Sequence, residues 1–190
     1  MDAGTKLKGL LEILSSAAEF ESLPVRHRED DSLKQLSLHC PQTLDEPRFN
    51  DPHTKANILL QSHFSRKELG REMAADLASV LDKSSRLLQA MVDVISSSGW
   101  LAPALASMEL SQMCVQAMWE RDSMLLQLPH VSKQLAAKCV SAGVESIFDL
   151  MDMEDEARVQ LLGLTQRQLV DVANACNRYP NIDVTFEVRG

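Results

Sequence analysis

Three polar residues at the edge of an apolar stretch have the spacing of a helix face that could contact nucleic acid. The stretch 87–119 contains only two charged residues, so its polar side chains stand out. Arg86, Gln89 and Asp93 recur at steps of three and four residues, with Ser97 next, which is the period of one α-helical face. Arginine can contact a phosphate or stack on a base as a single strand passes. A solvated polar stripe is the default interpretation of the same pattern, and periodicity alone favours it.

A second candidate is the segment LPHVSKQLA, which begins at Leu128. It resembles the hairpin of helix-hairpin-helix modules, usually LPGVGxxxA, whose glycines let backbone N–H groups approach a phosphate closely. Here His130 and Ser132 stand at the glycine positions, which would weaken a phosphate contact. We therefore interpret this hairpin as a packing or partner-binding element first and a nucleic-acid contact second. Its residues are Leu128, Pro129, His130, Val131 and Ser132.

Catalytic and metal-binding patterns are missing from the sequence. The segment GTKLKG lacks the GK[ST] ending of a phosphate-binding loop, and the acidic run MDMEDE lacks the alternating ligands and central glycine of a calcium loop. Neither the cysteines nor the histidines have zinc-site spacing, so we expect buried or partly exposed thiols in a reducing compartment. The sequence thus predicts no catalytic residue, no metal site and no cofactor in this chain. The cysteines are Cys40, Cys114, Cys139 and Cys176.

Composition indicates a helical globular protein without a broad basic surface. Hydrophobic residues make up 45% and aromatic residues only 4%, while there are 9 Met, a balance that favours helix-on-helix packing. The net charge of −8 argues against a surface that grips nucleic acid nonspecifically. No apolar stretch has the length of a membrane span, and Glu12 interrupts the apolar run near the start. We expect a cytosolic or nuclear protein that does not bind membranes.

The elements that position these residues are predicted to be helices, followed by one strand. In a helical bundle over residues 1–124, Asp51 caps a helix that begins at Pro52. A helix-loop-helix domain follows over 125–178, with Ser132 as a cap and Thr165–Gln168 as a capping box. The expected helices cover residues 5–20, about 29–40, 52–70, 72–98, 103–119, 132–143, a short one from 147, one ending near 163, and 165–177. Because 87–119 is so apolar, we expect its two helices to be buried on most sides.

The end of the chain, NIDVTFEVRG, is the strongest strand signal in the sequence. Ile182, Val184, Phe186 and Val188 alternate with polar residues, a period of two. One strand cannot satisfy its backbone alone. We expect this segment to be frayed, or docked onto the helices through its apolar side chains.

Several long segments resemble the Sec63 homology unit of large superfamily-two RNA helicases. They are FNDPHTKANILLQSHFSR, RLLQAMVDVISSSGWLAPALASMELSQMCVQAMW, DSMLLQLPH, GVESIFDLMDMEDEAR and NRYPNIDVTFEV. The similarity is strongest to the unit in the second, C-terminal cassette of the spliceosomal members. The corresponding unit of the activating signal cointegrator complex helicase is the nearest alternative.

The resemblance implies a mainly α unit that ends in the first strand of an incomplete immunoglobulin-like domain over 179–190. It implies a ratchet helix over about 84–98, with Arg86, Gln89 and Asp93 facing RNA. The chain would be a non-catalytic scaffold and protein-docking segment of a nuclear splicing helicase. Spliceosomal proteins and the upstream helicase domains, which hold ATP and Mg, would be its partners, and RNA a weak one. A stand-alone nucleic-acid-binding module built on the hairpin remains the alternative from a different class.

Overall fold

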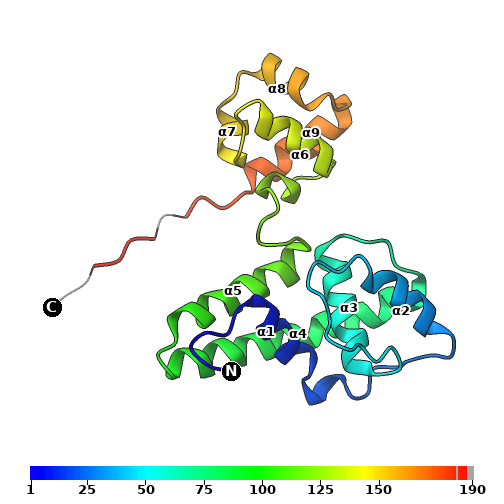
Figure 1. The fold of residues 1–190 in the computed structure, drawn as a ribbon. Helices are drawn as coiled ribbons and strands as arrows, with labels where there is room; N and C mark the ends of the chain where they lie inside the picture. The colour runs from blue at the N-terminus through cyan, green and yellow to red at the C-terminus, as the bar shows by residue number, and fades with distance from the viewer. Residues whose placement is uncertain (183, 188–190) are drawn as a thin grey trace. The chain divides into compact units, whose positions relative to one another are not determined.

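The computed structural model describes residues 1–182 and 184–187, and these residues form helices and their connections (Figure 1). The chain divides into two compact units, Met1–Glu120 and Arg121–Gly190. The first unit is mainly helical, as predicted for the bundle, and the second is a set of short helices. The domain boundary predicted from the sequence, at residues 124 and 125, lies a few residues after this division.

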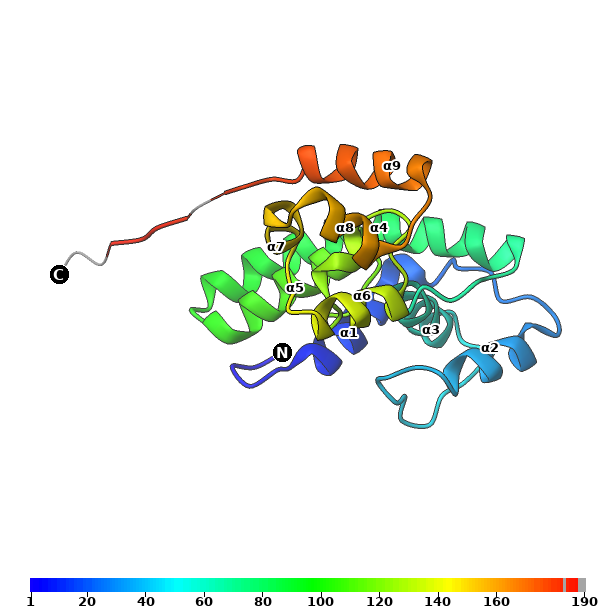
Figure 2. The ribbon, with the colours of Figure 1, turned by 90° about the horizontal axis from the view of Figure 1, so that it is seen from above.

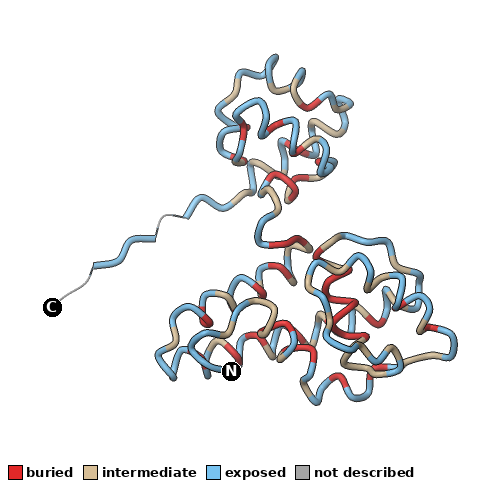
Figure 3. Tube along the Cα trace, viewed as in Figure 1, coloured by how far each residue is buried: buried red, intermediate tan, exposed pale blue. Residues whose placement is uncertain are grey.

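The first unit is built around α3 and the long helix α4. Its elements are α1 (Leu7–Ser15), a 3-10 turn η1 (Ala18–Phe20), α2 (Glu29–Ser37), α3 (Pro52–Phe64), α4 (Arg71–Ser97) and α5 (Leu101–Gln116). Every residue of α3 from Lys55 to Gln61 is buried, so this helix is surrounded on all sides (Figure 3). Helices α4 and α5 pack along each other, and α1 covers part of both. The core includes Leu10, Phe20, Leu60, Phe64, Leu88, Ile95, Leu110 and Trp119.

Local sequence signals explain where most of these helices begin and end. The Asp51 side chain accepts a hydrogen bond from the His53 backbone N–H at 2.7 Å, and Pro52 occupies the first turn, as predicted. Helix α4 ends before Gly99, whose φ of 73° suits glycine. The prediction that α3 continues to residue 70 is wrong: it ends at Phe64, and Arg66 adopts a left-handed φ of 51°.

The outer face of α5 is more exposed than the sequence suggested. Pro103, Ala104, Ser107, Leu110 and Met113 are buried. The opposite side exposes large apolar side chains, among them Leu101, Leu105, Met108 and Val115. The prediction that both helices of this stretch are buried on most sides is therefore wrong: α1, α3 and α4 cover only one side of α5, and α4 also has an exposed face.

The second unit consists of short helices with strong caps. Its elements are a 3-10 turn η2 (Met124–Gln127), α6 (Lys133–Ser141), α7 (Ile147–Asp152), α8 (Asp155–Leu162) and α9 (Gln166–Asn177). Ser146 and Asp149 form a capping box before α7, and Thr165 and Gln168 form the one predicted before α9. Its small core includes Leu125, Leu126, Ala136, Cys139, Ile147, Leu150, Leu162 and Val172.

The C-terminal segment is extended and exposed as far as the structure describes it. Residues 182 and 184–187 are in no strand, and the segment leads away from α9 (Figures 1 and 2). Ile182, Val184 and Phe186 are exposed by 76%, 85% and 89%, so the alternative that they dock onto the helices is wrong for this structure. Val188 lies outside the described residues. A lone segment has no neighbour to form a sheet ladder, so the predicted strand and immunoglobulin-like domain stay predictions.

Candidate nucleic-acid interface and its structural support

The polar stripe lies on the solvent-exposed side of α4. Arg86, Gln89 and Asp93 are all exposed. The opposite face of the same helix buries Val80, Ser84, Leu88, Met91 and Ile95 in the core. The sequence pattern therefore divided the two faces of this helix correctly. Nothing in this arrangement tests whether RNA contacts the exposed face, and that assignment stays a prediction.

Two of the stripe residues line a shallow groove between α4 and α5. Gln89 and Asp93 face it together with Ser85, Met108 and Ser111, and its volume is about 440 Å³. Arg86 is one helical turn earlier and does not line the groove. The groove thus offers amide, hydroxyl and carboxylate groups, which suit hydrogen bonds to bases or riboses. Phosphate is a poorer match, since only Arg86 on this face carries a positive charge, between the acids Asp82 and Asp93.

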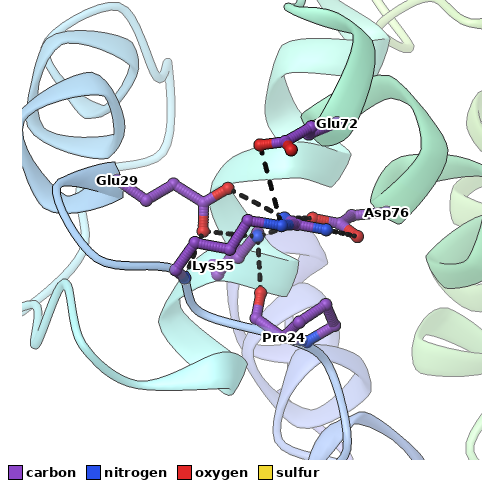
Figure 4. A network of polar contacts seen from close by, with 6 residues as sticks. Pro24, Glu29, Lys55, Glu72 and Asp76 are labelled. Atoms are coloured by element: carbon purple, nitrogen blue, oxygen red, sulfur yellow. Dashed lines mark hydrogen bonds and ion pairs between the residues drawn. The ribbon is translucent and has the colours of Figure 1, made fainter.

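A buried ionic network supports the first half of α4 (Figure 4). The Lys55 side chain is fully buried, and its Nζ donates hydrogen bonds to the Pro24 carbonyl at 2.6 Å and to Glu29 Oε2 and Asp76 Oδ2 at 2.7 Å each. Arg26 binds the same two carboxylates: its Nη2 donates to Asp76 Oδ1 at 3.0 Å and its Nη1 to Glu29 Oε1 at 3.2 Å. The network joins the start of α2, the first turn of α3 and the second turn of α4.

The network keeps both carboxylates ionised. The hydrogen bond from Arg26 lowers the pKa of Asp76 below its usual range, and the Lys55 ammonium adds to this against the effect of burial. Burial by itself would raise the pKa of Glu29, but the bonds from Lys55 and from the Arg26 backbone N–H outweigh it and lower that pKa. The Asp76 carboxylate in turn raises the pKa of Arg26. Both carboxylates and the Arg26 guanidinium are therefore charged at neutral pH, and each buried carboxylate accepts hydrogen bonds from Arg26 and Lys55.

The predicted hairpin forms a tight turn between η2 and α6. Leu128 and Val131 are buried, and the Ser132 hydroxyl accepts a hydrogen bond from the Leu135 backbone N–H at 3.2 Å. His130, at a glycine position of the hairpin pattern, has a φ of 63°, in the left-handed region that favours glycine. Its Nε2 lies 2.8 Å from Asp171 Oδ2 of α9. A carboxylate beside the turn disfavours a phosphate there, and no observation tests a nucleic-acid contact.

The cysteines have the environment of unreactive thiols. Burial raises the pKa of Cys40 to about 11 and that of Cys114 to about 12. Burial also raises the pKa of Cys139 and of Cys176. Within the described part of the chain, no group of three or more His, Cys, Asp or Glu side chains could hold a metal ion. In the same part, no helix combines the length and apolar character needed to cross a membrane.

Comparison with known proteins places the chain in a family. The family model described as the Sec63 Brl domain matches residues 1–190. The chain belongs to the Sec63 Brl domain family. It is 55% identical over 188 residues to the human U5 small nuclear ribonucleoprotein 200 kDa helicase, with 99% of this chain and 9% of the helicase covered.

Two further relatives extend this comparison. The fission yeast pre-mRNA-splicing factor brr2 is 45% identical over 184 residues, covering 97% of this chain and 8% of that protein. A Dictyostelium discoideum protein named activating signal cointegrator 1 complex subunit 3-like is 48% identical over 185 residues, covering 97% of this chain and 8% of that protein. The chain thus spans less than a tenth of the length of these relatives, and the Sec63 resemblance inferred from its motifs is confirmed.

Sequence reasoning missed the ionic network of this Sec63 unit. Asp76 lies four residues before Val80 and eight before Ser84, in the register of the buried face of α4, and this was a usable signal. Lys55 gave a weaker one, as the only Lys, Arg, Asp or Glu of the sequence between Asp51 and Arg66. No pattern linked them to Arg26 and Glu29, because the contacts join residues 21 to 50 positions apart.

Proposed function

We propose that the chain is a non-catalytic Sec63-type segment of a spliceosomal ATP-dependent RNA helicase, in its C-terminal cassette. There it acts in pre-mRNA splicing as a scaffold, a docking surface for other spliceosomal proteins and a guide for RNA. ATP and Mg²⁺ would be bound by helicase domains elsewhere in the same polypeptide, and the protein would act in the nucleus.

The observation that carries this proposal is the 55% identity over 188 residues to a U5 small nuclear ribonucleoprotein helicase. The alternative, a unit of an activating signal cointegrator complex helicase, has a lower identity of 48% in the relative with that name. A scaffold role fits the braced core of the first unit. A docking role fits the exposed apolar side chains on α5 and in the second unit.

RNA guiding is supported by the placement of the stripe on α4. A 27-residue helix spans about 40 Å, enough to follow several nucleotides. Since only Arg86 is cationic on this face, the contact would be weak and would depend little on salt. The C-terminal segment is proposed to be the first strand of an immunoglobulin-like domain, whose neighbouring strands would cover Val184 and Phe186.

A stand-alone helix-hairpin-helix nucleic-acid module is the weaker alternative. The net charge of −8 and the Asp171 carboxylate beside His130 both disfavour phosphate at the hairpin. Such a module would bind RNA or DNA with an affinity that falls steeply with salt concentration.

The test of the scaffold and docking role is affinity capture from a nuclear extract, with the tagged chain as bait. Recovery of splicing proteins supports the proposal, and a capture without any splicing protein contradicts it. The purified chain is expected to hydrolyse no ATP, so robust turnover would also contradict it.

RNA guiding is tested by ultraviolet crosslinking of the intact helicase polypeptide to its RNA. Arg86→Glu is expected to reduce crosslinks to α4, because it places a third carboxylate on the exposed face. Arg48→Glu is the matched control: it makes the same charge change at an exposed position in the loop before α3. Equal crosslinking by the wild type and both variants would refute an RNA contact at this stripe.

A further inference from the structure

The second unit has a largely apolar groove beside α9. Its volume is about 430 Å³, and α7, α8 and α9 line it. On α9 the buried Val172 lines the groove, together with residues that recur at three- and four-residue steps as one helical stripe: Gln166, Leu169, Val170, Ala173, Cys176 and Asn177. This stripe is about 16 Å long at 1.5 Å per residue. The groove is therefore long enough for a helix laid beside α9.

The walls of the groove expose apolar side chains that a partner could cover. Met151, Val159 and Val170 are exposed by 41%, 47% and 50%. Leu162, by contrast, is buried and closes the bottom of the groove. Half-exposed aliphatic side chains on both sides of a groove are the usual receptor for an amphipathic helix that inserts residues at i, i+3, i+4 and i+7.

Acidic residues lie next to lining residues of α7 and α8. Asp152, Glu154 and Glu156 are exposed and form no ion pair with any residue that the structure describes. The neighbouring depression at Asp155, Glu156, Val159 and Gln160 continues the groove toward these acids. The run MDMEDE, which the sequence left without a role, thus lies beside an apolar surface.

Among the described residues that line the groove, Arg158 is the only Lys or Arg, and it does not offset this acidic character. Arg158 Nη1 donates to Asp155 Oδ1 at 2.9 Å. Its Nε and Nη2 donate at 2.8 Å to the carbonyls of Leu150 and Met151. The guanidinium is thus held by its own unit and paired with one carboxylate, while the other three acids remain available to a partner.

We propose that the groove between α8 and α9 binds an amphipathic helix of a partner protein, whose apolar side chains fill the groove and whose flanking lysines or arginines meet Asp152, Glu154 and Glu156. This inference rests on the proposed function, because it specifies the chemistry of one partner for a docking unit. Charge complementarity selects this partner, since an apolar surface beside unpaired acids favours a basic helix and repels an acidic one.

The test measures the binding of two labelled synthetic helices to the full chain by fluorescence anisotropy. Both carry leucines at i, i+3, i+4 and i+7; one has lysines at its ends and the other has glutamates. The basic helix is expected to bind and the acidic one to bind at least about tenfold more weakly at low salt, a difference that shrinks as salt is added.

Matched variants locate the site. Val170→Asp is expected to weaken binding of the basic helix by about tenfold or more, because it places a charge in the apolar contact. Val140→Asp, on α6 outside the groove and exposed by 42%, is expected to bind like the wild type. Glu154→Gln with Glu156→Gln should weaken binding severalfold, while Glu145→Gln should not. Circular dichroism establishes that each variant keeps the wild-type helix content.

Several results would overturn the proposal: no binding of the basic helix, equal binding of both helices, or equal effects of Val170→Asp and Val140→Asp. A chain shortened to end at Tyr179 that binds the basic helix many-fold more tightly would assign the groove to residues 182–187 instead. A dimer that Val170→Asp converts to monomer would assign the groove to a second copy.

The same variants separate this inference from the proposed function. In one outcome, the basic helix does not bind, and Val170→Asp captures the same splicing proteins from nuclear extract as the wild type. This result refutes helix binding in the groove and leaves the proposed splicing role intact. Binding of the basic helix with no splicing protein captured by the wild type supports the groove and contradicts the splicing role.

Discussion

Replacing Lys55 by methionine is predicted to destabilise the first unit far more than an ordinary lysine substitution. The methionine side chain has a similar length and can occupy the buried channel, but it donates no hydrogen bond. The Pro24 carbonyl, Glu29 and Asp76 each lose a partner, and two buried carboxylates then share the single positive charge of Arg26.

The contacts that remain set the size of the effect. Removing one partner of a buried ion pair costs about 3–5 kcal/mol. Arg26 still donates to Glu29 through its backbone N–H and Nη1 and to Asp76 through its guanidinium, so neither carboxylate is left without a donor. We therefore expect the unfolding free energy to fall by about 3 kcal/mol, the lower end of this range. Such a loss corresponds to a fall in melting temperature of roughly 10 °C for a unit of this size.

The assay is urea unfolding followed by tryptophan fluorescence. Both tryptophans of the chain, Trp100 and Trp119, lie in the first unit, and Trp119 Nε1 donates to Ser65 Oγ at 2.9 Å in its core. Lys67→Met, at an exposed position just after α3, is the control, with an expected change within about 0.5 kcal/mol. If Lys55→Met lowered the unfolding free energy by less than about 1 kcal/mol, the claim that the Lys55 ammonium compensates the buried charges of Glu29 and Asp76 would be refuted.

A second variant tests the electrostatic cause. Adding Glu29→Gln to Lys55→Met removes one uncompensated carboxylate, so the double variant is expected to be more stable than Lys55→Met alone.

Titration with acid tests the same electrostatic cause. Because the folded pKa values of Glu29 and Asp76 are lowered, their contribution is present above about pH 4 and is lost as the pH falls further. The difference in unfolding free energy between wild type and Lys55→Met should therefore shrink in acid. A difference that stays constant with pH would contradict the electrostatic cause.

Two further predictions concern the thiols and the last helix. Cys114 should react with a disulfide reagent at pH 8 many times more slowly in the native protein than in urea, because burial raises its pKa to about 12. Comparable reaction rates in the two conditions, measured by stopped flow, would contradict this prediction. Thr165→Ala should lower the unfolding free energy of the second unit by about 1 kcal/mol, since it removes the hydroxyl that caps α9. Thr43→Ala, in an exposed loop, should have little effect on it. Hydrogen exchange of the α9 amides measures the effect of both variants.

Helix starts were predictable from the sequence because their signals are local. The signals act within a few residues, and the structure has a helix beginning at each of them: Asp51 with Pro52, Ser132, and Thr165 with Gln168.

Helix ends were less predictable. The sequence of α3 continues without glycine or proline to residue 69, so nothing local indicated that Arg66 would turn left-handed. In the structure, the Arg66 Nε donates to the Ala117 carbonyl at 2.7 Å, a contact across 51 positions that stabilises this turn.

The exposed polar face of α4 was found from the sequence, whereas the charges that support this helix were not, and the difference has a physical cause. A solvated face leaves a periodic pattern on one element, because each of its residues separately avoids burial. A buried network instead depends on contacts between side chains of separate elements, so even Asp76, which stands in the register of the buried face, gave no indication of its partners.

The two faces of α4 are predicted to have separable roles, the buried face in stability and the exposed face in RNA contact. Lys55→Met acts on the buried side, so any loss of RNA crosslinking that it causes should follow the fraction of unfolded protein and vanish at low temperature, where the unit is folded. Arg86→Glu acts on the exposed side and should reduce crosslinking without changing the urea midpoint. If Arg86→Glu instead shifted that midpoint as much as Lys55→Met does, the exposed residue would be a structural one, and the assignment of this face to RNA would have to be abandoned.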